Sequence, residues 1–424
     1  MNLLKKSRLG ELIEVTRGAS LSGEYYSTKG EYIRLTCGNF DYHNNCFKEN
    51  ASKDDLFYTG EFREEFLLEK GDIITPLTEQ AIGLLGTTAR IPKSGKYIQS
   101  QDIALVKCKA GKIDPTFCYY LISSRLVRNQ LSAAAQQTKI RHTSPDKIKA
   151  CTVWIPELDE QITIGRLLAS LDDKIHLNKR INDNLEAMAK QLYDYWFVQF
   201  DFPNKEGKPY KSSGGAMVWN EKLKREIPSC FEVVNMGKLC DFRNGINYSK
   251  DETGNDYQIV NVRNISSSRI LLDGEDFDVI TVPTSKAENY VLKPDDIIIA
   301  RSGCPGSTRL LLSPANTLFC GFIICCSPND SSMRNYLVYC LKQLEGTNAT
   351  TSGGSILQNV SQDTLKGLHV IVPEKQIIDK FNKTIELTFA RMLNCLKESK
   401  ALIKQRDELL PLLINGQASV NYHL

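Results

Sequence analysis

Two short motifs in the sequence resemble catalytic ones, and both are incomplete. The loop from Gly303 to Thr308, GCPGST, is the nearest match to a phosphate-binding loop, but it has no lysine to reach the phosphates. The triplet Glu398 to Lys400, ESK, has the charged pair of a metal-nuclease motif, but no Pro-Asp pair occurs within the 100 residues before it. An adenine methyltransferase needs an acidic residue or Asn followed by Pro-Pro-aromatic to hold a flipped base, and no Pro-Pro dipeptide occurs. The sequence therefore predicts no catalytic centre of these three classes.

Histidine and cysteine, the usual transition-metal ligands, are scattered along the chain. The thirteen cysteines form no CxxC pair, which favours reduced thiols over disulfides or a zinc site. Cys325 and Cys326 fall in the apolar run FIICC, which predicts a buried strand. The five histidines show no metal-ligand spacing; they are His43, His142, His176, His369 and His423. We expect no metal and no cofactor on this chain.

The length and composition are those of a globular protein of two to three domains. The 424 residues are 42% hydrophobic, enough for sizeable cores. No run of 18 or more uncharged apolar residues occurs, and the start MNLLKKSRLGEL lacks the features of a signal peptide. We therefore expect a cytoplasmic protein without a membrane partner.

The net charge of +3 is small, but the charges are unevenly distributed. Residues 8–80 contain 8 basic and 14 acidic residues, whereas residues 81–150 contain 12 and 3. A basic region of this kind could form a face that follows phosphates, or it could be a solvated surface without a ligand. In the second half the bias is weak, with 5 basic and 3 acidic residues over 297–372.

A long helix predicted from Gln161 to Phe200 must position the rest of the chain. One apolar stripe alternates spacings of four and three over more than four heptads. Its members are Ile164, Leu168, Leu171, Ile175, Asn178, Asn182, Leu185, Ala189, Leu192 and Trp196, with Leu167, Ile181 and Met188 alongside. At 1.5 Å per residue the helix is roughly 50 to 60 Å long, which is typical of a spacer. The two asparagines either fix the register of a coiled coil or mark a solvated break.

An internal repeat relates the two halves of the chain. LGELIEVTRG at Leu9 returns as MGKLCDFRNG at Met236, 227 residues later, and FLLEKGDIIT at Phe66 returns as YVLKPDDIII at Tyr290, after 224. IKACTVWIPE at Ile148 returns as LKGLHVIVPE, after 217. The matches stay in order while the offset falls in small steps, as insertions and deletions between two copies would produce.

Each copy contains short β-branched or aromatic runs between Gly, Asn, Pro and Ser loops, with one helix late in the copy. This pattern predicts an α/β or α+β domain. A second heptad helix follows the second copy, running from Ile378 through Phe381, Ile385 and Arg406 to Leu413. If the two helices pack antiparallel, the Gly- and Ser-rich segment 201–228 is long enough to return the chain.

Taken together, this layout resembles the specificity subunit of a type I restriction-modification enzyme. The resemblance covers essentially the whole chain, and its most specific part is LDDKIHLNKRINDNLEAMAKQLYDYWFVQFDFPN in the centre. It implies two target recognition domains, at 1–156 and 228–373, that each read one half of a bipartite site in double-stranded DNA. It also implies a central spacer helix and return loop at 157–227 and a C-terminal spacer helix at 374–424. The expected fold class is thus α/β (α+β), with two repeated domains separated by two long antiparallel coiled-coil helices.

The resemblance also implies partner proteins. Two methyltransferase subunits are expected to dock on the helices, and restriction/translocase subunits are expected to join them. S-adenosylmethionine, ATP and Mg are then expected on those partners. The residues proposed for subunit docking are Leu185, Leu192, Tyr195, Trp196, Leu402 and Leu409. The alternatives are the specificity subunit of a methylation-only complex and a duplicated protein-binding scaffold.

If the domains read DNA, polar side chains on supported loops should contact the base edges and phosphates. For the first domain we predict Arg17, Ser20, Tyr25, Tyr26, Thr78, Gln80, Thr87, Arg90, Gln137, Lys139 and Arg141. For the second we predict Arg243, Asn244, Asn247, Tyr248, Arg301, Ser302, Ser307, Arg309, Ser352, Ser355 and Gln358. The alternative for each single residue is an ordinary surface or turn position. The target sequence does not follow from these residues.

Overall fold

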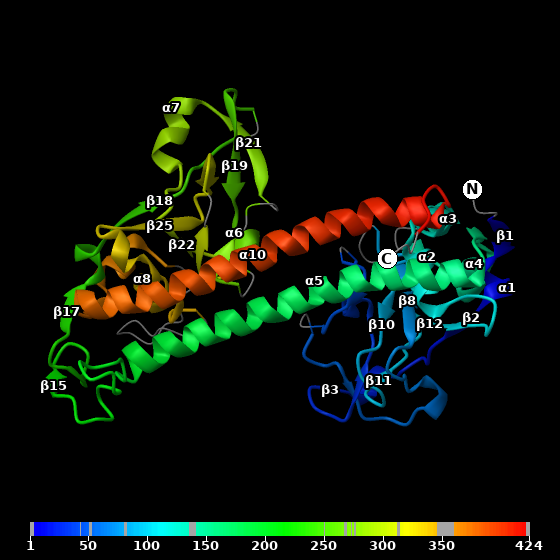
Figure 1. The fold of residues 1–424 in the computed structure, drawn as a ribbon, viewed down its shortest axis with the longest axis horizontal. Helices are drawn as coiled ribbons and strands as arrows, with labels where there is room; N and C mark the ends of the chain where they lie inside the picture. The colour runs from blue at the N-terminus through cyan, green and yellow to red at the C-terminus, as the bar shows by residue number, and fades with distance from the viewer. Residues whose placement is uncertain are drawn as a thin grey trace. The chain divides into compact units, whose positions relative to one another are not determined.

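The computed structural model describes residues 4–42, 44–50, 53–79, 83–134, 141–249, 251–266, 269–272, 274, 277–311, 314–345 and 360–420. The chain forms two compact units. Unit 1 comprises Met1–His176 and Lys400–Leu424, and unit 2 comprises Leu177–Ser399. Two long helices, α5 (Leu158–Tyr193) and α10 (Lys375–Ile414), each contribute one part to each unit (Figure 1).

Unit 1 is built on an antiparallel sheet in the order β10-β8-β12-β2. Its strands are Ala89–Arg90, Ile73–Pro76, Ile103–Cys108 and Ile13–Arg17. A smaller sheet has the order β11-β4-β7-β3, with strands Tyr97–Ile98, Tyr32–Arg34, Phe57–Tyr58 and Tyr26–Ser27. Two-residue ribbons are formed by β9 (Thr78–Glu79) with β13 (Arg141–His142) and by β5 (Phe40–Asp41) with β6 (Cys46–Phe47).

Short helices cover the larger sheet of unit 1. They are α1 (Leu9–Leu12), α2 (Pro115–Ser123), α3 (Arg125–Ala134) and α4 (Pro145–Ala150), and the pair β1 (Lys5–Arg8) and β14 (Thr152–Ile155) lies beside them. Ile164 and Leu168 of α5 are buried in the same core as Phe117 of α2 and Leu413 of α10. The start of α5 therefore packs with the end of α10 in this unit.

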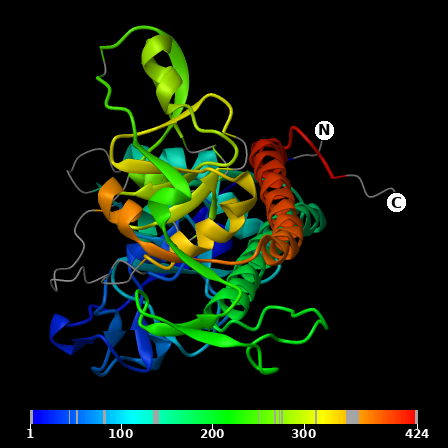
Figure 2. The same cartoon turned by 90° about the vertical axis from the view of Figure 1, so that its left-hand side faces the viewer.

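Unit 2 contains a five-stranded sheet in the order β18-β25-β22-β23-β20. Its strands are Cys240–Asn244, Ile323–Pro328, Ile297–Ala300, Thr308–Leu311 and Leu271–Leu272. A second sheet joins β21 (Asp278–Val282), β19 (Asn255–Val260) and β24 (Thr317–Phe319). Figure 2 shows β19, β21 and α7 (Thr284–Ala287) standing out as a lobe of this unit.

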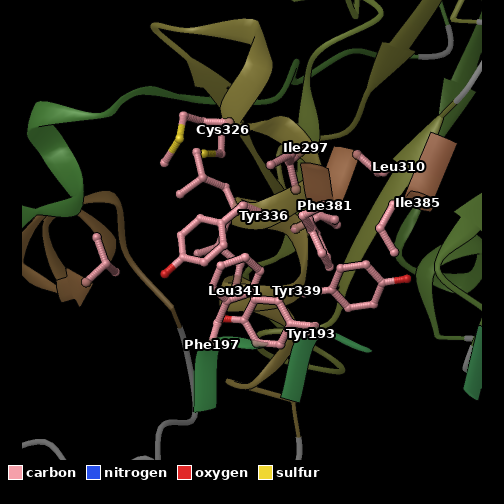
Figure 3. Packing of buried hydrophobic residues seen from close by; sticks show 14 of the residues in the cluster. Tyr193, Phe197, Ile297, Leu310, Cys326, Tyr336, Tyr339, Leu341, Phe381 and Ile385 are labelled. Atoms are coloured by element: carbon pink, nitrogen blue, oxygen red, sulfur yellow. The ribbon is translucent and has the colours of Figure 1, made fainter. Parts of the chain in front are cut away.

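Aromatic side chains join the two long helices to each other and to α8 in unit 2. Tyr193 of α5 stacks on Tyr339 of α8 (Arg334–Lys342) with ring centroids 5.6 Å apart. Phe197, in a π-helical turn from Asp194 to Val198, lies 5.0 Å from Phe381 of α10 (Figure 3). The end of α5 therefore packs with the start of α10 here, and the two helices run in opposite directions.

The heptad prediction is confirmed at most positions and wrong at one. Ile164, Leu168, Asn178, Asn182 and Ala189 are all buried, as a seam requires. The predicted flanking residue Met188 is 62% exposed, because it lies on the side of α5 away from the seam. The Asn178 amide donates to Glu398 Oε2 over 2.8 Å, so the alternative of a solvated break does not hold there.

The return segment is more ordered than its composition predicted. It contains an antiparallel hairpin of β15 (Met217–Asn220) and β16 (Arg225–Pro228). Phe202 is buried and stacks between Tyr210, at 4.6 Å, and Phe231, at 4.9 Å. These aromatic residues join the segment to the core of unit 2, which its Gly and Ser content did not indicate.

The two units repeat one fold, in agreement with the internal sequence repeat. In unit 1, strand β1 pairs antiparallel with β14. In unit 2, β17 (Glu232–Asn235) pairs in the same way with β26 (His369–Val372). Ser144 caps α4 as Ser361 caps α9 (Gln362–Gly367), and each serine hydroxyl accepts a backbone N–H three residues later. The mixed α/β fold with two β-rich domains and two packed long helices is therefore confirmed.

Candidate nucleic-acid interface

In unit 1, several predicted segments meet at one end of the larger sheet. The Leu77 N–H, just after β8, donates to the Asp102 carbonyl over 2.7 Å, and the Thr143 N–H donates to the Leu77 carbonyl over 2.8 Å. The Ala19 N–H, just after β2, donates to the Gln99 carbonyl over 2.9 Å. We call this end the unit 1 strand-end face.

Unit 2 has the same arrangement at the equivalent end of its sheet. The Arg301 N–H, just after β22, donates to the Phe322 carbonyl over 2.8 Å, and the Val360 N–H donates to the Arg301 carbonyl over 2.9 Å. The Ile246 N–H donates to the Phe319 carbonyl over 2.8 Å. We call this end the unit 2 strand-end face.

A glycine is needed at the same place in both faces. A Cβ built on Gly18 would lie 2.2 Å from the Gln99 carbonyl oxygen, and one on Gly245 would lie 2.1 Å from the Cys320 carbonyl oxygen. No side chain fits at such distances, so both loops must cross the neighbouring turn at a glycine. The loops that follow are thereby held against rigid strand ends, as a recognition surface requires.

The structure leaves many of the predicted contact residues exposed or half-buried. The exposed ones are Arg17, Ser20, Tyr25, Asn244, Asn247, Tyr248 and Arg301. The half-buried ones are Tyr26, Arg90, Arg141, Arg243, Ser302 and Ser307. Gln80, Gln137, Lys139, Ser352, Ser355 and Gln358 lie outside the described residues.

Three predicted residues are covered by protein and have little surface available to DNA. Thr78 and Thr87 are buried, and the Thr78 hydroxyl donates to Asp102 over 3.1 Å. Arg309 is only 2% exposed and forms an ion pair with Glu345. These side chains stabilise the domains from inside, since a buried polar group needs an internal partner.

Two further predicted positions lie away from the strand-end face of unit 1. Arg90 pairs with Ile73 at the opposite end of β8, and its guanidinium lies 5.0 Å from the Tyr119 ring centroid. Tyr26 belongs to the smaller sheet, where the Arg34 guanidinium stacks on its ring at 3.6 Å. Thr78, just after β8, and Arg90, beside its first residue, therefore lie at opposite ends of that strand.

Charge on the two faces is partly neutralised. Arg141 lies 3.5 Å from the buried Glu79 carboxylate, and Arg243 is 2.6 Å from the buried Asp296 carboxylate. Arg17 and Arg301 are exposed and make no ion pair within the described part of the chain. Burial, with Cys320 and Asp278 nearby, raises the pKa of the Tyr248 hydroxyl, so this group stays protonated at neutral pH and can both donate and accept.

Two residues of these faces were missed by sequence reasoning. His142 is exposed beside Thr78, whose hydroxyl lies 3.3 Å from His142 Nδ1. Phe322 is 63% exposed next to Arg301. Aligning QDIALV of the first copy with GFIICC of the second would have drawn attention to Phe322, because it places a phenylalanine where the first copy has Asp102.

The incomplete catalytic motifs have structural roles. The loop from Gly303 to Thr308 connects two antiparallel strands, β22 and β23, instead of leading into a helix. Glu398 accepts a hydrogen bond from Asn178 in the helix seam. The described residues contain no group of three or more His, Cys, Asp or Glu side chains arranged to hold a metal ion.

The sequence profile of the family described as type I restriction modification DNA specificity domain matches residues 1–187 and 228–398. This chain belongs to that family. A type I specificity subunit is the non-catalytic DNA-recognition chain of a restriction-modification system. No helix among the described residues of this subunit has the length and apolar character needed to cross a membrane.

Two specificity subunits are similar to this chain in sequence. That of the type I restriction enzyme MjaIX from Methanocaldococcus jannaschii is 24% identical over 311 residues, which is 72% of this chain and 69% of the relative. That of the HindI enzyme from Haemophilus influenzae is 23% identical over 382 residues, covering 76% and 81%.

The fold is also found in a solved structure. The S subunit of the type I system from M. genitalium superposes with a TM-score of 0.55 at 16% identity, covering 97% of this chain and 96% of the other. This likeness supports the arrangement of two β-rich domains with two long helices.

Most of the residues predicted to dock partner subunits contact the specificity subunit itself. Leu185, Leu192 and Trp196 pack against the core of unit 2, and Leu409 packs against the core of unit 1. Leu402 is half-buried. Tyr195 is 39% exposed, so it is the predicted docking residue with the most free surface.

Proposed function

We propose that each unit of this specificity subunit reads one half of a bipartite site in double-stranded DNA through its strand-end face. Arg17 and Ser20 in unit 1, and Asn247 and Arg301 in unit 2, can donate to base edges and phosphates. The recognition domains are residues 1–156 and 228–373, and the helical parts are 157–227 and 374–424.

The observation that carries this proposal is the duplicated backbone at the two faces. In unit 1, the backbone of Leu77 is hydrogen-bonded to Asp102 and Thr143. In unit 2, the backbone of Arg301 makes the same two bonds, to Phe322 and Val360. The frame is thus the same, while the exposed side chains on it differ. Two domains that share one backbone arrangement but expose different side chains are suited to a DNA site whose two halves differ in sequence.

The partners follow from the same proposal. The paired helices α5 and α10 dock two methyltransferase subunits, and restriction/translocase subunits bind to these. S-adenosylmethionine, ATP and Mg are then bound by the partners. The purified chain without these partners should neither methylate nor cleave DNA, and turnover by such a preparation would contradict this division of labour.

A domain exchange tests the reading of half-sites. Residues 1–156 are replaced by the equivalent part of a specificity subunit with another target, and the complex with its methyltransferase is expressed in a host. Sequencing of methylated adenines should show one changed half-site and one parental half-site. The reciprocal exchange of 228–373 is the control, and a change in both half-sites from either exchange would refute independent reading.

Adding the restriction subunit separates the two remaining possibilities for the complex. Cleavage that depends on ATP and on the unmethylated target identifies a restriction system. A complex that binds and methylates but recruits no restriction subunit is the methylation-only alternative. If this chain bound a partner protein but had no affinity for DNA, the scaffold alternative would be supported. Measuring its binding to duplex DNA over a series of salt concentrations tests that affinity directly.

A further inference from the structure

A tight turn holds Phe322 at the unit 2 strand-end face. The turn runs from Cys320 to Ile323, and the Ile323 N–H donates to the Cys320 carbonyl over 2.9 Å. The Gly321 N–H donates to the Ile246 carbonyl over 2.9 Å, and the Arg301 N–H donates to the Phe322 carbonyl over 2.8 Å. The backbone on both sides of Phe322 is therefore fixed, while its ring is 63% exposed.

The equivalent turn of unit 1 shows that this backbone does not need an aromatic residue. It runs from Ser100 to Ile103 with the same closing hydrogen bond, at 3.0 Å. Asp102 stands where unit 2 has Phe322, and its carboxylate accepts the Thr78 hydroxyl. Since the turn forms equally well with an internally bonded aspartate, folding alone does not account for an exposed phenylalanine.

The surroundings of Phe322 are polar and suited to DNA. Arg301 and Asn247 are exposed. A Cβ built on Gly321 would lie 2.2 Å from Asn247 Oδ1, so this amide lies directly against the turn. Arginine and asparagine donate to purine edges in the major groove, whereas a phenyl ring can contact only the apolar C5-methyl group of thymine there.

We propose that Phe322 contacts the C5-methyl group of a thymine in the half-site read by unit 2. This inference rests on the proposed function, because it needs the strand-end face to lie in the major groove. Phe322 thereby adds to the half-site an apolar contact that unit 1 lacks at the equivalent position, where Asp102 stands.

Uracil tests the contact, because it differs from thymine only by the missing methyl group. The target is first defined by sequencing methylated adenines in the host. The complex of the specificity subunit with its methyltransferase is then titrated, at one salt concentration, with duplexes that carry this target with a single thymine replaced by uracil. One uracil in the unit 2 half-site should weaken binding of the wild-type complex about threefold to tenfold, as expected for one buried methyl group. The Phe322→Ala complex should bind the thymine and uracil duplexes equally.

Controls separate this contact from general damage. Phe322→Leu keeps an apolar side chain and should keep part of the preference for thymine. Uracil in the unit 1 half-site should affect wild-type and Phe322→Ala complexes to the same extent.

Three results would overturn the proposal. One is a wild-type complex insensitive to every uracil in the unit 2 half-site. Another is a Phe322→Ala complex that stays as sensitive as wild type. The third is equal weakening of all duplexes by Phe322→Ala, which points to a wedge between base pairs instead. Only a complex without any dependence on the unit 2 half-site would contradict the proposed function as well.

Discussion

At the scale of single residues, a buried charged group joins the recognition domain of unit 1 to its helices. Asp172 of α5 accepts the Tyr120 hydroxyl of α2 over 2.6 Å and the Arg406 guanidinium of α10 over 2.9 Å. The pKa of Arg406 is raised, because Asp172 and Asp407 outweigh the effect of burial. One carboxylate thus fixes three helices relative to one another within this unit.

Removing one partner of this group should destabilise unit 1. Arg406→Ala leaves Asp172 largely buried without its cation, which we expect to cost about 3 kcal/mol. Urea unfolding, monitored through hydrogen exchange of the α2 amides, measures the loss of unfolding free energy. Lys208→Ala, which breaks an exposed pair with Glu206, is the matched control and should change little. An unchanged midpoint for Arg406→Ala would contradict a stabilising role for the pair.

Single residues also show where prediction from sequence stops. Arg301 and Arg309 were predicted to share one loop and look equivalent in sequence. Arg309 instead lies on β23 and pairs with Glu345 inside the domain, whereas Arg301 is exposed. Residue type does not reveal whether a charged group has an internal partner. Gly18 and Gly245, in contrast, were marked by the repeat, because the backbone crossing at each tolerates no other residue.

At the scale of elements, the long helices were the most predictable part of the fold. Their heptad spacing is a local property of the sequence, so the buried positions follow from period alone. Strand pairing depends on contacts between distant segments, and the alternation of short strands could not reveal it. The aromatic residues at 202, 210 and 231 illustrate this, because only their packing shows that the return segment is folded.

The seam contains one polar atom without a partner among the described residues. Asn182 is 3% exposed, and its Oδ1 atom accepts no hydrogen bond. Asn182→Leu should therefore stabilise the helix pair of unit 2 by about 1 to 2 kcal/mol, measured as a higher urea midpoint. Asn178→Leu loses the bond to Glu398 and should gain less. A lower midpoint for Asn182→Leu would mean that the amide stabilises the seam.

The surface at the end of α5 that is available to partners can be tested at Tyr195, in the π-helical turn that follows this helix. Because its ring is 39% exposed, Tyr195→Ala should weaken binding of the methyltransferase at least severalfold while leaving thermal unfolding unchanged. Leu192→Ala is the comparison, since Leu192 packs on the core and its loss should lower the unfolding temperature. Mass measurement of the assembled complex gives the stoichiometry, and one methyltransferase per chain would count against two docking faces.

At the scale of the whole molecule, the helix pair is proposed to set the spacer between the half-sites. Inserting seven residues into α5 near Asn178 and seven into α10 near Glu398 keeps the heptad phase on both sides of the seam. Each helix lengthens by about 10 Å, the length of about three base pairs. The half-sites would also rotate by roughly 100°, so the longer spacer should be bound more weakly.

Sequencing of methylated adenines in cells that carry the doubly extended subunit measures the spacer. We expect the same specified bases separated by up to about three more base pairs. A single insertion, in α5 alone, is the control and should abolish activity because it puts the seam out of register. An active double insertion with the parental spacer would show that another part of the complex fixes the distance.

The crossings at Gly18 and Gly245 also bear on the history of the chain. The two copies are 227 residues apart at these glycines, 224 at Asp72 and Asp296, and 217 at Ser144 and Ser361. The same 217 separates Ile155 from Val372, the last paired residues of the two domains. The net changes of length between the copies therefore fall before the capping serine, and none falls between that serine and the final strand. A recognition domain of this kind can thus change in length before the capping serine while the segment that leads into the long helix keeps its length.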